Sequence, residues 1–280
     1  AIAVAILKQE NYLKIRNTEI LLKDIDIDYK SVPTNITTYL KLNKLVAHPN
    51  TLAVKSLKFG FKDITLDSSD IALEMGPTKK VEKTATQLQV KEVLSSFSIS
   101  SDSIKIGESH FRLDNSSMPV TKFGMDYGHL DLQNINLSAG NLLYNLDTTM
   151  ATIRNASFKE KSGFVLNELN TDFLFTNTGT SLKNLYIKTP GTILRRDLAI
   201  SYPSLDKLAA NPATALILDL DIESSSIQVK DILTFAPALL SLPAFANPNQ
   251  IWDLNGKVYG HLNEMHFNDL RFKGLSITTM

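Results

Sequence analysis

A six-residue pattern recurs along this chain: an apolar residue, any residue, an Asn or Asp, an apolar residue, any residue and a final apolar residue. In a regular strand the side chains alternate between the two faces, so the first apolar residue would point away from the other two. A β-bulge at the Asn or Asp returns all three to one face, and both residue types tolerate the backbone that a bulge requires. The pattern therefore predicts a long, bent sheet with one apolar face.

Five strong copies of the pattern occupy residues 22–27, 61–66, 132–137, 182–187 and 267–272, and weaker copies occupy residues 15–20 and 153–158. The intervals between the copies are irregular, which argues against a solenoid of fixed period. We expect their apolar positions to share one face of the sheet. These positions are Ile25, Ile27, Ile64, Leu66, Leu132, Ile135, Leu137, Leu182, Leu185, Ile187, Phe267, Leu270 and Phe272.

The rest of the chain also favours antiparallel β-structure. Short runs alternate apolar and polar residues, as at Ile104/Ile106 and Phe111/Leu113, and turn signals such as Asn115-Ser116-Ser117 and Asn255-Gly256 separate such runs. Helical patterns are few and lie at residues 37–47, 204–210 and 229–240, the last interrupted by Pro237. The helix at 229–240 either packs over an end of the sheet or plugs an apolar groove.

Composition excludes several classes of protein. The 280 residues carry 29 Lys and Arg against 29 Asp and Glu, which lacks the basic footprint of nucleic-acid binding. The chain has no Cys, so a disulfide framework and a thiolate metal site are excluded. No motif of a hydrolase, a nucleotide-binding loop or a zinc protease is present. We therefore expect no enzymatic activity and no cofactor.

Histidine spacing argues against a metal site. Of the five His residues only His261 and His266 are close in sequence, and their spacing of five would place them on opposite faces of a single strand. The sequence thus predicts no metal ligation.

Several local strings resemble the TamB branch of the AsmA-like proteins of Gram-negative envelopes. These strings occupy residues 158–164, 184–192, 227–237 and 243–249. The resemblance covers residues 97–280 best, whereas residues 1–96 share only the strand pattern.

The resemblance implies a fold and a function. TamB-like proteins are long periplasmic β-structures whose sheet curls into an open trough with an apolar lining, and an N-terminal helix tethers them to the inner membrane. They are thought to conduct phospholipids between the membranes, and to assist outer-membrane protein assembly with an Omp85-type barrel resembling TamA. By this resemblance residues 1–280 form one continuous trough segment of a longer periplasmic protein, the tether and the barrel-docking part lie outside it, and the thirteen apolar positions contact phospholipid acyl chains.

Two other functions fit the pattern less well. A structural scaffold or adhesin-like β-solenoid would fill its apolar face completely, and a hydrolase on a β-helix would gather carboxylates on one surface. The irregular spacing of the copies and the lack of a carboxylate cluster favour the lipid conduit. The sequence leaves open whether the apolar face is covered.

Overall fold

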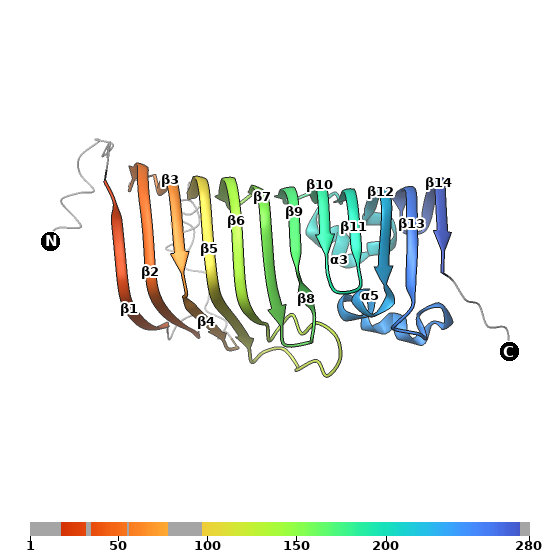
Figure 1. The fold of residues 1–280 in the computed structure, drawn as a ribbon, viewed down its shortest axis with the longest axis horizontal. Helices are drawn as coiled ribbons and strands as arrows, with labels where there is room; N and C mark the ends of the chain where they lie inside the picture. The colour runs from red at the N-terminus through yellow and green to blue at the C-terminus, as the bar shows by residue number, and fades with distance from the viewer. Residues whose placement is uncertain (1–17, 32–34, 55, 78–96, 275–280) are drawn as a thin grey trace.

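The computed structural model describes residues 18–31, 35–54, 56–77 and 97–274. Within these ranges the chain is mostly β-structure, and its strands form one sheet of fourteen strands. Figure 1 shows the strands side by side along the longest axis, in nearly the order of the sequence. The predicted all-β class with a few short helices is confirmed. The curling of the sheet into an open trough stays a prediction.

The strands differ in length from two to eighteen residues. In chain order they are β1 (Ile20–Ser31), β2 (Ile36–Ala53), β3 (Lys58–Asp67), β4 (Asp70–Met75), β5 (Ser98–Asn115), β6 (Asp131–Asn145), β7 (Thr148–Glu160), β8 (Val165–Leu166), β9 (Glu168–Thr176), β10 (Gly179–Lys188), β11 (Ile193–Ser201), β12 (Ile217–Gln228), β13 (Ile251–His261) and β14 (Glu264–Lys273). Neighbouring strands pair antiparallel, except that β5 runs parallel to β3 and β4. Strands β3 and β4 continue one another between β2 and β5, with a break at Ser68.

Bulges occur where the repeated pattern predicts them. Asp24, Asn134, Asn184 and Asp269 adopt positive φ angles of 50°, 52°, 52° and 50°, the left-handed conformation that Asn and Asp tolerate. In the remaining strong copy Asp63 keeps an ordinary φ. There the pairing register shows the bulge instead. Ala47 and Pro49 of β2 are two residues apart, whereas their partners in β3, Ile64 and Phe61, are three apart, so β3 holds one extra residue.

Polar side chains on the adjacent strand hold three of the bulges. The residue with positive φ would otherwise lose a ladder partner for its N–H, and an unpaired backbone group costs free energy. The N–H of Glu108 donates to Asn136 Oδ1 at 3.2 Å, and that of Asn184 donates to Asp197 Oδ1 at 2.8 Å. The N–H of Ser224 donates to Asn255 Oδ1 at 3.1 Å. One device, a carboxylate or amide oxygen from the next strand, therefore recurs along the sheet.

The helices are short and lie in the C-terminal half of the described chain. They are α3 (Leu205–Ala210), α4 (Pro212–Ala215) and α5 (Val229–Phe235), followed by the 3₁₀ turns η1 (Pro237–Ser241) and η2 (Pro243–Phe245). Helix α3 begins at Ser204, whose Oγ accepts the N–H of Lys207, and α5 ends before Pro237 as predicted. None of the described helices combines the length and the hydropathy needed to cross a membrane.

Two local predictions were wrong. Residues 37–47, predicted to be helical, lie within strand β2. Asn255-Gly256, predicted to be a turn, lies inside strand β13, where Gly256 has a φ of 128° and sits opposite the bulge of β14. A glycine is needed there, because a Cβ would come within 2.6 Å of the backbone of Leu270.

Candidate functional site: the apolar face of the sheet

The register of β10 shows that its bulge has the effect the pattern predicts. Leu182 and Ile187 are five residues apart, which in a regular strand would place them on opposite faces. Their partners in β9 are Phe173 and Leu169, which are only four apart and so share a face. The partners in β11, Leu198 and Leu194, are also four apart. Leu182 and Ile187 therefore lie on the same face.

The same test holds in two other strands. Phe267 and Phe272 of β14 face Val258 and Leu254 of β13, which are four residues apart. Leu132 and Leu137 of β6 likewise face Glu160 and Ala156 of β7. A further register shift in β7 brings Ile153 and Ala156 to one face, and it coincides with the weaker copy of the pattern at residues 153–158. The weaker copy at 15–20 lies mostly outside the described residues.

Apolar side chains follow one another from strand to strand on this face, which we call the apolar face. One row crosses β7 and β9 to β14 and consists of Ala151, Phe173, Leu182, Leu198, Leu220, Val258 and Phe267. A second row crosses β1, β2, β3, β5, β6 and β7 and consists of Leu22, Leu45, Leu66, Ile106, Leu137 and Ala156. The two rows reach β7 at different residues, Ala151 and Ala156, and Ile153 lies between them on the same face, so apolar side chains occur on this face from β1 to β14.

The thirteen predicted lining residues come from five strands, namely β1, β3, β6, β10 and β14. Leu185 alone among them is buried, with 3% of its surface exposed. The others are half-buried or exposed, up to 45% for Ile27 and 54% for Phe267. A filled core would bury nearly all of them, so the described part of the chain leaves most of this face accessible.

The sequence pattern did not identify all residues of the face. Phe173, Leu198 and Val258 were missed because their strands carry no Asn or Asp copy of the pattern, and Leu220 was missed although residues 217–222 of β12 fit it. The signal available in β12 was the plain alternation of Leu218, Leu220 and Ile222 with aspartates.

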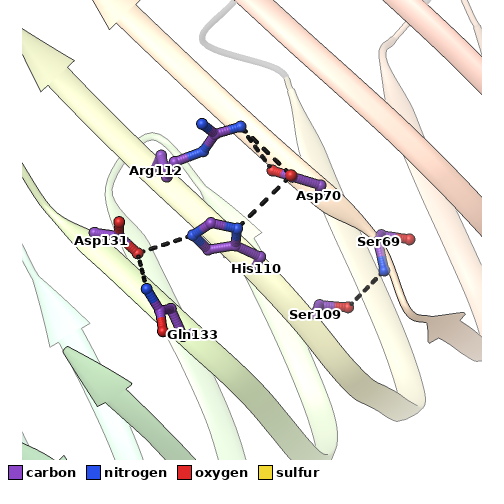
Figure 2. A network of polar contacts seen from close by, with 7 residues as sticks. All are labelled: Ser69, Asp70, Ser109, His110, Arg112, Asp131 and Gln133. Atoms are coloured by element: carbon purple, nitrogen blue, oxygen red, sulfur yellow. Dashed lines mark hydrogen bonds and ion pairs between the residues drawn. The ribbon is translucent and has the colours of Figure 1, made fainter. Parts of the chain in front are cut away.

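On the opposite face, polar side chains of β4, β5 and β6 form a network of contacts (Figure 2). His110 and Arg112 flank Phe111 in β5 and therefore point away from the apolar face. His110 Nε2 lies 2.8 Å from Asp131 Oδ1, and its Nδ1 lies 3.7 Å from Asp70 Oδ2. Arg112 donates to Asp70 at 3.2 Å. These contacts join three neighbouring strands by their charged side chains.

Asp131 titrates below its ordinary range. Burial raises the pKa of its carboxyl group, but hydrogen bonds from His110 and Gln133 and the positive charges of His110 and Arg112 lower this pKa further than burial raises it. The carboxylate is therefore ionised at neutral pH and can hold the polar face together.

Two small clusters cover the apolar face at one end. The first, here the loop cluster, consists of Met125, Phe164 and Leu166, and Ile187 packs against it. The second, here the helix cluster, consists of Val229, Leu233 and Trp252, and Phe272 packs against it. Helix α5 thus packs over an end of the sheet, the first of the two roles predicted for residues 229–240.

The loop before β6 and helix α5 are tied together. The N–H of Met125 donates to the carbonyl oxygen of Thr234 at 2.6 Å, and the rings of Phe164 and Phe235 lie 4.9 Å apart. Asp231 fixes α5 to the turn after β10, because its Oδ2 accepts hydrogen bonds from Thr189 and Thr192 at 2.5 and 2.6 Å. Met125 and Thr234 are more than a hundred residues apart in sequence. The pattern of a single strand therefore could not predict that the loop and helix α5 together cover this end of the apolar face.

The prediction for the histidines rested on a wrong assumption. His261 and His266 belong to adjacent strands, because β13 ends at His261 and β14 begins at Glu264. His266 stacks on Tyr259 with ring centroids 5.0 Å apart. In the ranges that the structure describes, no three His, Cys, Asp or Glu side chains gather as metal ligands would.

No family model and no curated protein matches this chain.

Proposed function

We propose that this chain binds lipid acyl chains along the apolar face of its sheet. The observation that carries the proposal is the combination of continuity and exposure. Apolar rows run from β1 to β14, and twelve of the thirteen predicted lining residues remain partly or largely accessible. A face of this kind suits an apolar ligand that lies across many strands.

The energetics favour such a ligand. Each buried methylene contributes about 0.8 kcal/mol, so exposing an acyl chain of roughly sixteen carbons to water costs on the order of 13 kcal/mol. The row from Ala151 to Phe267 crosses seven strands. At about 4.8 Å per strand it extends about 29 Å, about twice the depth of one leaflet in a bilayer core of about 30 Å. One row is therefore long enough for an extended acyl chain.

The resemblance to TamB-like proteins extends this proposal to the whole protein. We propose that the chain is a segment of a periplasmic protein tethered to the inner membrane, which moves phospholipid between the membranes or assists outer-membrane protein assembly with an Omp85-type barrel. Acyl chains would slide along the apolar face, while the ionised opposite face stays in water. The same division of faces supports a binding role without catalysis.

The proposal is tested by placing a charge in the row. Leu182→Asp and Leu270→Arg each put a charge on the apolar face, where contact with hydrocarbon would cost several kcal/mol by desolvation. Both residues are half-buried, so the charge can reach water when no lipid is bound. Leu185 is a poorer choice, because it is buried and its replacement would also unfold the sheet locally.

The assay is the transfer of a fluorescent phospholipid from donor vesicles to the full chain. We expect both variants to fold, as judged by circular dichroism, and to take up much less lipid than the wild type. Lys183→Glu, on the polar face beside Leu182, is the matched control and should transfer lipid normally. Normal uptake by both folded row variants would refute the proposal and favour a structural scaffold.

A further inference from the structure

A cavity of about 520 Å³ lies between the loop before β6, the turn after β7 and helix α5. Its lining includes three lysines from these three segments, together with three hydroxyl side chains. The residues are Lys122, Lys161, Lys230, Thr121, Ser162 and Thr234. The volume falls within the range of small-molecule sites. We call this cavity the lysine pocket.

The lysine pocket carries a positive charge that the chain as a whole does not. Its lining has three lysines and one carboxylate, Asp126, a formal net charge of +2 (three minus one), whereas the 280 residues carry 29 charges of each sign. Lys122, Lys161 and Lys230 are exposed, and none of them forms an ion pair within the described residues. Their ammonium groups are therefore available to an anion.

The nearby carboxylates are already engaged. Asp126 is 4% exposed and accepts hydrogen bonds from the N–H of Thr121 and from His129, both at 3.0 Å. Glu160, also 4% exposed, accepts the N–H of Ser162 at 2.6 Å. Asp231, next to Lys230, is bonded to two threonines on the sheet side of α5. These hydrogen bonds hold the carboxylates in the walls of the pocket, and Lys161 also interacts electrostatically with Asp126.

The lysine pocket adjoins the covered end of the apolar face. Gly124 and Asp126 line the pocket, while Met125 between them belongs to the loop cluster against which Ile187 packs. Leu233 lines the pocket and also belongs to the helix cluster. Phe123 also lines the pocket and is 55% exposed, so a ligand here would meet ammonium groups beside accessible hydrocarbon, which is the chemistry of an anionic amphiphile.

We propose that the lysine pocket binds the phosphate group of a phospholipid whose acyl chains lie on the adjoining apolar face. This inference rests on the proposed lipid binding and adds a recognition site for the headgroup. Lysine is a common phosphate ligand, and hydrogen bonds from an ammonium group to a phosphate oxygen are about twice as strong as neutral ones. The pocket would thus select phosphate-bearing lipids over neutral lipids with the same chains.

The test compares phosphatidic acid with diacylglycerol of identical chains, which lacks the phosphate. The pocket variant combines Lys122→Gln, Lys161→Gln and Lys230→Gln in the full chain. The control variant combines Lys23→Gln, Lys44→Gln and Lys183→Gln, which removes three exposed lysines that do not line the pocket. Affinity is measured by extraction of each labelled lipid from vesicles of neutral lipid at fixed ionic strength.

We expect the pocket variant to bind phosphatidic acid about tenfold more weakly, a change of about 1.4 kcal/mol, and to bind diacylglycerol unchanged. The control variant should match the wild type for both lipids. Equal affinity of the pocket variant and the wild type for phosphatidic acid would overturn the inference, even if both bind lipid well.

A third probe, glycerol 3-phosphate, distinguishes a lipid headgroup from a free phosphate compound. Weak binding of this probe supports a headgroup site, because the acyl chains then supply most of the affinity. Binding as tight as that of phosphatidic acid would overturn the headgroup assignment. If neither lipid binds, the proposed function itself fails, and the headgroup site fails with it.

Discussion

Replacement of Asn184 in the β10 bulge tests the structural device that creates the apolar face. Its φ is 52°, and the left-handed conformation costs other L-residues roughly 1–2 kcal/mol. Its Nδ2 also donates to Asp172 Oδ2 at 2.8 Å, an exposed bond worth about 0.5–1.5 kcal/mol. Asn184→Val loses both contributions and should destabilise the fold by about 2–3 kcal/mol. Asn184→Gly loses the hydrogen bond but keeps the conformation, and should cost about 1 kcal/mol or less.

The assay is urea unfolding of both variants and of a matched pair at Asn170. Asn170 lies in β9 without positive φ and donates to Glu168 at 2.8 Å, so it offers a similar bond in a regular strand. At position 170 the Val variant should be more stable than the Gly variant, the reverse of position 184, because Val favours strands and Gly does not. If Val at position 184 were as stable as Gly, the bulge would not depend on the left-handed residue, and the reasoning from the repeated pattern would be refuted.

Three further outcomes follow from burial and charge. Leu185→Ala should lower the free energy of unfolding in urea by about 2–5 kcal/mol, as expected for a core residue. Phe267→Ala should lower it clearly less, because Phe267 is 54% exposed. Equal losses would contradict an accessible face. Because the pKa of Asp131 is lowered from 3.8, its charge stabilises the fold above that pH, and this stabilisation is lost as pH falls through the folded-state pKa. Asp131→Asn should therefore be less stable than the wild type at neutral pH and equally stable in strong acid. A loss of stability that does not depend on pH would contradict this. Asp231→Ala should speed hydrogen exchange in α5 while β1 and β2 stay protected, and unchanged exchange in α5 would show that the two threonine bonds do not hold the helix.

The bulges were the most predictable part of the fold. A side chain on a strand can reach one face only, so an apolar spacing of three followed by two brings all three side chains to one face only where an extra residue is inserted. Asn134, Asn184 and Asp269 have the predicted backbone, and Asp63 reaches the same result through a register shift. The position of such a bulge depends only on local backbone geometry, so it can be predicted without knowledge of the neighbouring strands.

The same geometry explains the false helix at residues 37–47. Leu42 and Leu45 of β2 are three apart, and they pair with Ile25 and Leu22 of β1, which are three apart across the bulge at Asp24. A spacing of three is also the spacing of one face of a helix, so a bulged strand and a short helix give the same apolar pattern. The false turn at Asn255-Gly256 has a similar cause, because a bulge and a turn both favour glycine.

The cover and the lysine pocket could not be predicted from sequence. Lys122, Lys161 and Lys230 are separated by 39 and 69 residues and lie on a loop, a turn and a helix. They come together because the loop before β6, the turn after β7 and helix α5 after β12 all lie at the same end of the sheet (Figure 1). Such a site depends on long-range topology, whereas the pattern of each segment alone indicates only a solvated lysine.

The most direct test of lipid binding is native mass spectrometry of the full chain purified without detergent, followed by lipid extraction. We expect adducts with the masses of phospholipids on the wild type and on Lys183→Glu. These adducts should be lost from folded Leu182→Asp. A wild-type chain that carries no lipid, and takes up none from added phospholipid vesicles, would contradict the claim that its apolar face is a lipid-binding surface.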